Sequence, residues 1–211
     1  MSNNITPINE YHTFTLNKNL EMFIHAESLV NRPALRDNEL VAFIRIGTDF
    51  TNNYYQIEVP LKPTDFGAAS ASEIWPDENR LNLPLEVLQK VKAMVIGDPS
   101  YVSTELNFFR EDGTPVNDGD PYELGSRRVG IKGNPSFGNI RVLMLGVKNG
   151  LPDSDSRDLC GEVWFNELRL SDLKNEGGWA AIVNMDANVA DFANVSATGR
   201  RSTVGFGALE Q

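Results

Sequence analysis

The sequence predicts a mainly β protein, namely an antiparallel β-sandwich of jelly-roll type with one amphipathic helix. Successive segments alternate apolar and polar side chains with the period of a half-buried strand, and Gly, Pro and Asn turns separate them. One segment, residues 83–96, instead has helical spacing. The pattern changes again after Leu170. We therefore expect a lead-in segment over residues 1–20, a β-sandwich domain over 21–176 and a C-terminal extension over 177–211.

The formal net charge of −10 and the single cysteine limit the function. A strongly acidic surface repels phosphate backbones, so we expect no nucleic-acid partner. Cys160 alone excludes an internal disulfide and a cysteine-based zinc site. No apolar run approaches the roughly 20 residues of a membrane helix, and residues 1–14 lack the features of a signal peptide. We expect either a cytoplasmic protein or a piece of a larger one.

The first part of the domain predicts three strands. Residues 21–27 form a short apolar strand, and residues 41–46 follow a turn region. Residues 54–61 alternate most cleanly, which places Ile57 and Val59 on one face with other apolar side chains. We expect both residues in the core.

The helix is expected over residues 83–96. Asn82 can cap it, Pro84 suits its first turn, and Gly97 can end it. Its apolar residues share one face, as expected of a helix packed against the edge or end of a sandwich. They are Leu85, Leu88, Val91 and Val95.

Two strands are expected next, over residues 101–109 and 127–132, with a turn-rich loop between them. Residues 139–147 are apolar on both faces, which indicates a strand covered on both sides in the middle of a sheet. We expect Leu143 and Leu145 in the core.

The last strand of the domain, residues 162–170, reads EVWFNELRL. Strict alternation puts Trp164, Leu168 and Leu170 on one face, so we expect Trp164 and Leu168 to fill the core. The same line resembles the closing strand of many carbohydrate-binding β-sandwich modules.

In the extension, residues 180–198 alternate small apolar residues with Asn, Asp, Ser and Thr in runs of about ten, a weak signature of outer-membrane barrel strands. Val183 and Met185 alternate there with Asn184 and Asp186. On the pattern alone, an ordinary exposed hairpin or a disordered tail is the favoured interpretation.

Several stretches resemble the SprA/Sov family, the giant outer-membrane translocon proteins of the type 9 secretion system of Bacteroidetes, which are also tied to gliding motility. The resemblance runs from about Glu21 to Gln211, and its stretches are MFIHAES, AFIRIGTDFTNNYYQIEVPL, IWPDENRLN, IKGNPSFGNIRVLMLGVKN, EVWFNELRL, GGWAA and RRSTVGFGALEQ. It implies a domain of a protein-export channel in the cell envelope, at the cell surface or in the periplasm. It implies secretion-system components and secreted cargo proteins as partners, favours barrel strands over residues 180–198, and carries no catalytic residues.

Aromatic residues support a second function, that of a carbohydrate-binding β-sandwich module. Tyr54, Tyr55 and Trp75 are candidates for contact with a sugar or with a protein partner. Two or three exposed coplanar rings on a concave sheet face would favour the sugar. A glycosidase is less well supported, because it needs two carboxylates about 5–10 Å apart in a groove and no motif identifies such a pair.

We expect no enzymatic activity and no cofactor, apart from a candidate calcium ion. Asp153, Asp155 and Asp158 lie in an oxygen-rich loop that could hold Ca²⁺, but a solvated acidic turn is the favoured interpretation. His25 lies in the middle of a strand, where a hydrogen-bonded or solvent-facing role is expected rather than a catalytic one.

Overall fold

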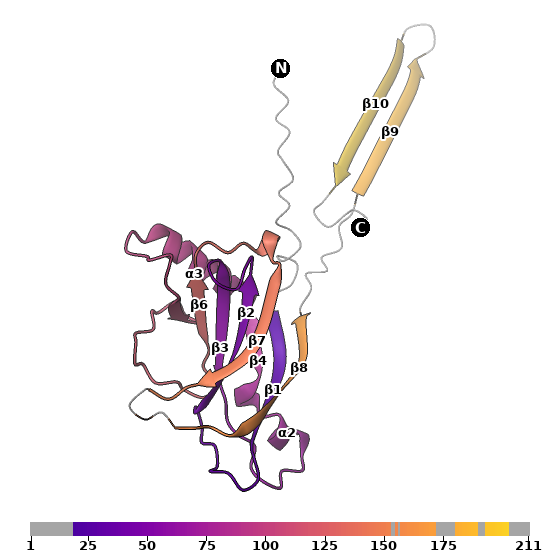
Figure 1. Ribbon diagram of the computed structural model, residues 1–211. Helices are drawn as coiled ribbons and strands as arrows, with labels where there is room; N and C mark the ends of the chain where they lie inside the picture. The colour runs from indigo at the N-terminus through magenta and orange to yellow at the C-terminus, as the bar shows by residue number, and fades with distance from the viewer. Residues whose placement is uncertain (1–18, 153–154, 156, 172–179, 190–192, 203–211) are drawn as a thin grey trace. The chain divides into compact units, whose positions relative to one another are not determined.

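The protein is mainly β, with antiparallel sheets and few helices, as predicted. By its contacts the chain divides into two compact units, Met1–Leu173 and Lys174–Gln211. The computed structural model describes residues 19–152, 155, 157–171, 180–189 and 193–202 (Figure 1).

The larger sheet has five strands in the order β5-β6-β3-β2-β7, all antiparallel. Their bounds are β2 Leu40–Gly47, β3 Tyr54–Pro60, β5 Asn107–Arg110, β6 Arg128–Lys132 and β7 Val142–Asn149. Every residue of the central strand β3 is buried, so this strand is covered on both faces. Ile57 and Val59 lie in the core, which confirms their prediction.

The smaller sheet has three strands in the order β4-β1-β8, also antiparallel. Its strands are β1 Asn19–Ser28, β4 Leu81–Pro84 and β8 Gly161–Ser171. Met22 and Ile24 of β1 share one apolar cluster with Ile44 and Ile57 of the larger sheet. The two sheets therefore enclose a common core.

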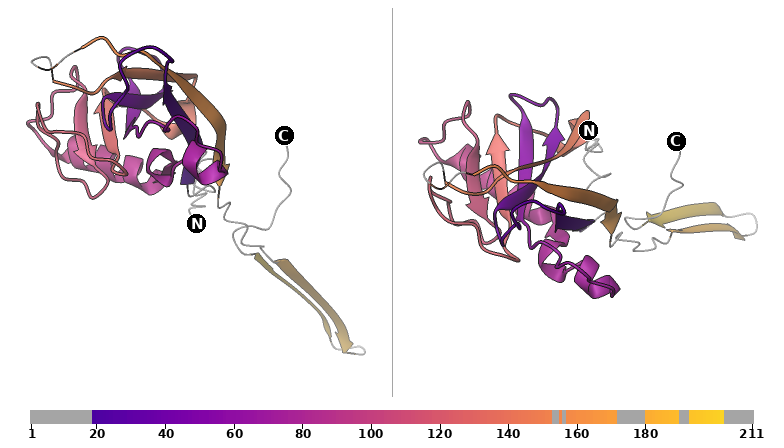
Figure 2. Two further views of the ribbon diagram at one scale, coloured as in Figure 1. Left: turned by 90° about the horizontal axis from the view of Figure 1, so that it is seen from below. Right: turned by 60° about the horizontal axis from the view of Figure 1, so that its bottom comes forward.

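The longest described helix is α3, Leu85–Gly97, and it packs its buried face against this core. That face consists of the four predicted residues, Leu85, Leu88, Val91 and Val95. The helix begins two residues later than predicted because Leu81–Pro84 pairs with β1 as strand β4, and Asn82 does not cap it. The other helical segments are α2, Ala71–Ile74, and the 3-10 turns η1, Asp77–Asn79, and η2, Phe137–Asn139. The helices lie along one side of the strands in both views of Figure 2.

Strand β7 lies at an edge of the larger sheet, so its predicted central place is wrong. Its register with β2 puts Leu143 and Leu145 on the core side, opposite Ile46 and Ile44. Leu145 packs against the core, but Leu143 is 49 % exposed and is not a core residue. Apolar residues on both faces thus do not require a neighbour on both edges.

Trp164 is 51 % exposed, which overturns the prediction that it fills the core. A β-bulge is the reason. Asn166 pairs with Phe23 and Arg169 with Glu21, so two residues of β8 stand opposite one residue of β1. The extra residue shifts the alternation, and Leu168 packs against the core while Trp164 faces outward.

Strand β5 is shorter than predicted, because residues 101–105 form turns in which the Glu105 N–H bonds the Val102 carbonyl. Tyr101 still packs against the core, and its hydroxyl donates to the Gly133 carbonyl at 3.1 Å.

The second unit contains a hairpin of β9, Ala180–Val189, and β10, Ala193–Ser202. The two strands pair without a break in register from Val189 and Ala193 to Ala180 and Ser202. Within the residues described, no helix is long and apolar enough to cross a membrane.

Candidate ligand-binding face

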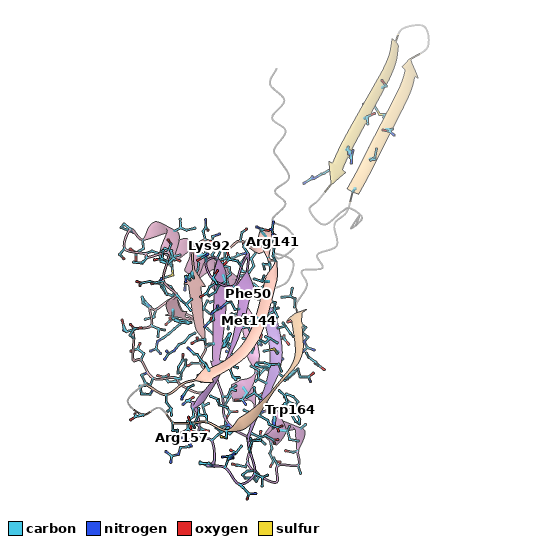
Figure 3. All side chains as sticks on the ribbon, viewed as in Figure 1. Phe50, Lys92, Arg141, Met144, Arg157 and Trp164 are labelled. Carbon is cyan, nitrogen blue, oxygen red and sulfur yellow. The ribbon has the colours of Figure 1, made fainter. Side chains whose placement is uncertain are left out.

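The outward side of the three-stranded sheet carries a group of aromatic rings, which we call the aromatic face and which consists of Phe23, His25, Trp75 and Trp164. His25 lies between the two tryptophans, with ring centroids 5.7 Å from Trp75 and 5.1 Å from Trp164. Phe23 meets Trp75 edge to face at 6.4 Å. Figure 3 labels Trp164 on β8, close to α2.

A hollow of about 400 Å³ opens beside these rings. This volume lies in the usual range of small-molecule sites. Rings, short polar side chains and carboxylates line it together. The lining residues are Phe23, Ala71, Ser72, Trp75, Asp77, Asn166 and Glu167.

The bulge in β8 brings Asn166 and Glu167 to the hollow together. Neighbouring residues of a regular strand point to opposite faces of the sheet, so without the bulge only one of them could reach it. Glu167 has φ +54°, a left-handed conformation that costs a non-glycine residue about 1–2 kcal/mol. The backbone therefore places a carboxylate here at an energetic cost.

Helix α2 is capped by its own hydrogen bonds and is joined to the sheet by a contact from His25. Ser70 and Glu73 form a capping box, in which Ser70 Oγ accepts from the Glu73 N–H and the Glu73 carboxylate accepts from the Ser70 N–H. These bonds lower the pKa of Glu73. The buried His25 ring contacts the Ile74 carbonyl through Nδ1 at 2.7 Å, which confirms its predicted hydrogen-bonded role.

An ion cluster borders the aromatic face. The Glu21 carboxylate accepts from Arg80 at 3.2 Å, from Arg169 at 2.9 Å and from the Ser171 hydroxyl at 2.5 Å. These partners, Ser171 first, lower the pKa of Glu21 to about 2. The cluster joins β1 to β8 and to the segment that precedes β4.

A second hollow of about 490 Å³ adjoins the first and shares Ser72 and Asp77 with it. It is lined mainly by the loop between β3 and α2, which includes the largely exposed Phe66.

Of the predicted contact residues, Trp75 lines the first hollow, whereas Tyr54 and Tyr55 line neither of the two. Tyr54 and Tyr55 are buried, at 4 % and 1 % exposed, so they offer no platform to a ligand. Tyr54 packs under the guanidinium of Arg45 at 4.0 Å, and Tyr55 stacks on Phe137 at 5.1 Å. The strand is covered on both faces, which its alternating sequence did not reveal.

The predicted calcium loop cannot be assembled from the structure. Asp155 and Asp158 are described, but Asp153 lies outside the described residues. Among the positions that the structure does describe, no group of three or more His, Cys, Asp or Glu side chains suits a metal ion.

Sequence reasoning missed a polar cluster on the outward side of the five-stranded sheet. Glu58 of β3 is fully buried, and its carboxylate contacts Lys148 Nζ at 2.6 Å and accepts from Gln56 at 2.7 Å and from the Tyr122 hydroxyl at 2.6 Å. Burial, with the Glu58 carboxylate beside it, raises the pKa of Tyr122. A glutamate on the polar side of an alternating strand reads as solvent-facing, so the sequence gives no signal of this cluster.

Comparison with protein-family models assigns the chain to a family. A model described as "motility related/secretion protein", the N-terminal model of the SprA family, matches residues 11–211. The chain belongs to this motility related/secretion protein family. The resemblance seen in the sequence is thereby confirmed, and no curated protein matches the chain. Family membership associates the protein with secretion and motility, and so with secretion-system components of the cell envelope.

Proposed function

We propose that the chain is a non-enzymatic structural and interaction domain of an outer-membrane protein-export channel, the translocon of the type 9 secretion system that also serves gliding motility. Its membership of the motility related/secretion protein family supports this proposal. The observation that carries it furthest is the hairpin of the second unit.

The hairpin has the dimensions and the pattern of a barrel hairpin. Each strand has ten residues, and a spanning strand needs about 9–11. The register pairs Val183 with Gly199 and Met185 with Ala197, and between these pairs it places Asn184 opposite Thr198. Over these pairs one face is apolar and the other polar, whereas at the open end of the hairpin Ile182 lies on the polar face and Arg201 on the apolar one.

Described side chains on the apolar face of this hairpin are open to solvent. Val183 and Met185, which lie on it, are both more than half exposed. A two-stranded hairpin alone is marginally stable in water, so neighbouring strands or lipid must complete it. We place it in the wall of the channel barrel, with the sandwich, of jelly-roll type, outside the membrane at the cell surface or in the periplasm. Other secretion-system components and cargo proteins are its proposed partners.

The carbohydrate-binding alternative is weaker. Of its three predicted contact residues, Tyr54 and Tyr55 are buried and Trp75 lines the first hollow. Calcium at Asp153, Asp155 and Asp158 stays a prediction.

Single-cysteine labelling tests the barrel placement. Val183→Cys and Asn184→Cys, each in a background with Cys160→Ser and any other cysteine replaced, would carry an environment-sensitive fluorophore in outer-membrane vesicles from cells that make the protein at its natural length. We expect blue-shifted emission and quenching by lipid-attached quenchers at position 183, and quenching by aqueous iodide at position 184. Equal access of iodide to both positions would overturn the proposal.

A further inference from the structure

We propose that the hollow beside Phe23 and Trp75 binds the arginine or lysine side chain of an extended polypeptide that adds to the edge of β8 facing away from β1. This inference rests on the proposed function as an interaction domain and adds the chemistry of the partner. Three observations carry it: the charge of the lining, the geometry of the rings and an edge of β8 that pairs with no other strand among the described residues.

The lining of the hollow is acidic. Asp77 and Glu167 contribute carboxylates, Ser72 and Asn166 contribute neutral polar groups, and no basic residue belongs to it. Arg169 approaches Glu167 only at 3.6 Å, and both side chains are at least half exposed. An exposed pair of this kind contributes little, so it competes weakly with an incoming cation.

The rings suit a cation better than a sugar. Phe23 and Trp75 meet at an interplanar angle of 75°, and His25 and Trp164 at 44°, so no flat platform of coplanar rings exists on the aromatic face. An aromatic corner beside carboxylates is instead the arrangement that recognises ammonium and guanidinium groups. Phe23 already accepts one guanidinium of the protein, because Arg80 Cζ lies 5.2 Å from its ring centroid.

The edge of β8 indicates that the ligand is a polypeptide. Within the described part of the chain, β8 pairs on one side only, with β1. The backbone groups of an open edge can pair with an added strand, whose alternate side chains then reach pockets on the sheet face. Asn166 and Glu167 belong to β8 itself, so the hollow borders this edge. The bulge restricts regular pairing to residues 161–166.

Peptide binding to the 211-residue chain in lipid-free buffer tests the proposal. The probe is the fluorescein-labelled octapeptide Gly-Thr-Val-Arg-Val-Thr-Val-Gly, compared by fluorescence anisotropy with the same peptide carrying neutral citrulline for arginine. We expect the arginine peptide to bind at least tenfold more tightly, and its advantage to shrink with added salt because the charges are exposed. Equal affinity of the two peptides, or no binding of either, would overturn the proposal.

Variants of the hollow test whether its carboxylates cause the preference for arginine. Asp77→Asn and Glu167→Gln should each weaken the arginine peptide, and together they should abolish its advantage over citrulline. Glu86→Gln removes the same charge from an exposed position of α3 and should change nothing. Thermal melts identify any variant that unfolds, and the two amide variants keep the shape of the side chains they replace.

A sugar is the competing ligand. Binding of cellotriose or chitotriose that is lost in Trp75→Ala, while the arginine peptide fails to bind, would assign the hollow to carbohydrate and overturn the polypeptide proposal. Failure of the peptide test leaves the hairpin experiment unaffected, since that experiment measures lipid contact in another unit.

Discussion

The outward faces of the two sheets differ in how they are covered. On the five-stranded sheet, Tyr122 of the loop between β5 and β6 reaches Glu58, and Lys148 of β7 completes the cluster, so a charged residue in the middle of β3 is fully buried. On the three-stranded sheet, α2 covers His25 but leaves Trp164 half exposed beside an open hollow.

The difference shows that residue type does not decide which face is closed. The polar face is the buried one, because each polar atom of Glu58 finds a partner within the domain. The aromatic face is the open one, although burial of its rings would stabilise the protein more. The open aromatic face is the side on which we propose that a polypeptide binds.

Of the changes that test this comparison, removal of Glu58 should lower the stability of the protein most. Glu58→Ala leaves Lys148, Gln56 and the Tyr122 hydroxyl without their shared partner, and we expect the free energy of unfolding to fall by about 3 kcal/mol. Urea titration measures the change, with Glu86→Ala as the exposed control. A loss below about 1 kcal/mol would show that water reaches Glu58 and that this face is not closed.

The second largest loss of stability is expected at acid pH, through the ion cluster beside the aromatic face. The pKa of Glu21 falls from 4.5 to about 2 in the folded protein. Its stabilising effect is therefore fully present above about pH 4.5 and is lost as the pH falls toward 2. In Glu21→Gln, stability should decline less between pH 5 and 2 than in the wild type, as measured by urea titration at each pH. Parallel curves for the two proteins would refute the assignment.

Trp164→Ala should have the smallest effect on stability. Because the ring is half exposed, we expect a loss below about 1 kcal/mol, well short of the roughly 3–5 kcal/mol typical of a buried tryptophan. A thermal melt checks this value. A loss in the larger range would mean that the aromatic face is closed in solution.

Local patterns in the sequence predicted the elements that have one regular period. The alternation of residues 54–61 identified β3 with Ile57 and Val59 in the core, and helical spacing identified the buried face of α3. Strand order was not readable in this way. Side chains report whether a strand's faces are covered, whereas its neighbours depend on pairing with distant residues, so β7 was expected at the centre and lies at the edge.

The candidate site was predicted only in part, through Trp75. Its other half depends on the bulge in β8, and no glycine or proline marks the extra residue at that point of the sequence. Strict alternation therefore assigned Trp164 to the core. An Asn-Glu pair within a strand that has apolar residues on both sides is the one signal that could have suggested a break in the alternation.

The pairing of β1 with β8 has a consequence for how the domain forms. Strand β1, the first described strand, pairs with β8, the last described strand of the same unit. The contact of Glu21 with Arg169 joins residues 148 positions apart. Pairings between such distant residues are slow to form because a long loop must close first. During synthesis, β1 can pair with β4 early, but its other edge stays open until β8 leaves the ribosome. A chain shortened before residue 161 should therefore expose the core residues of β1 and aggregate, and a chaperone that holds this strand would protect the domain until its last strand arrives.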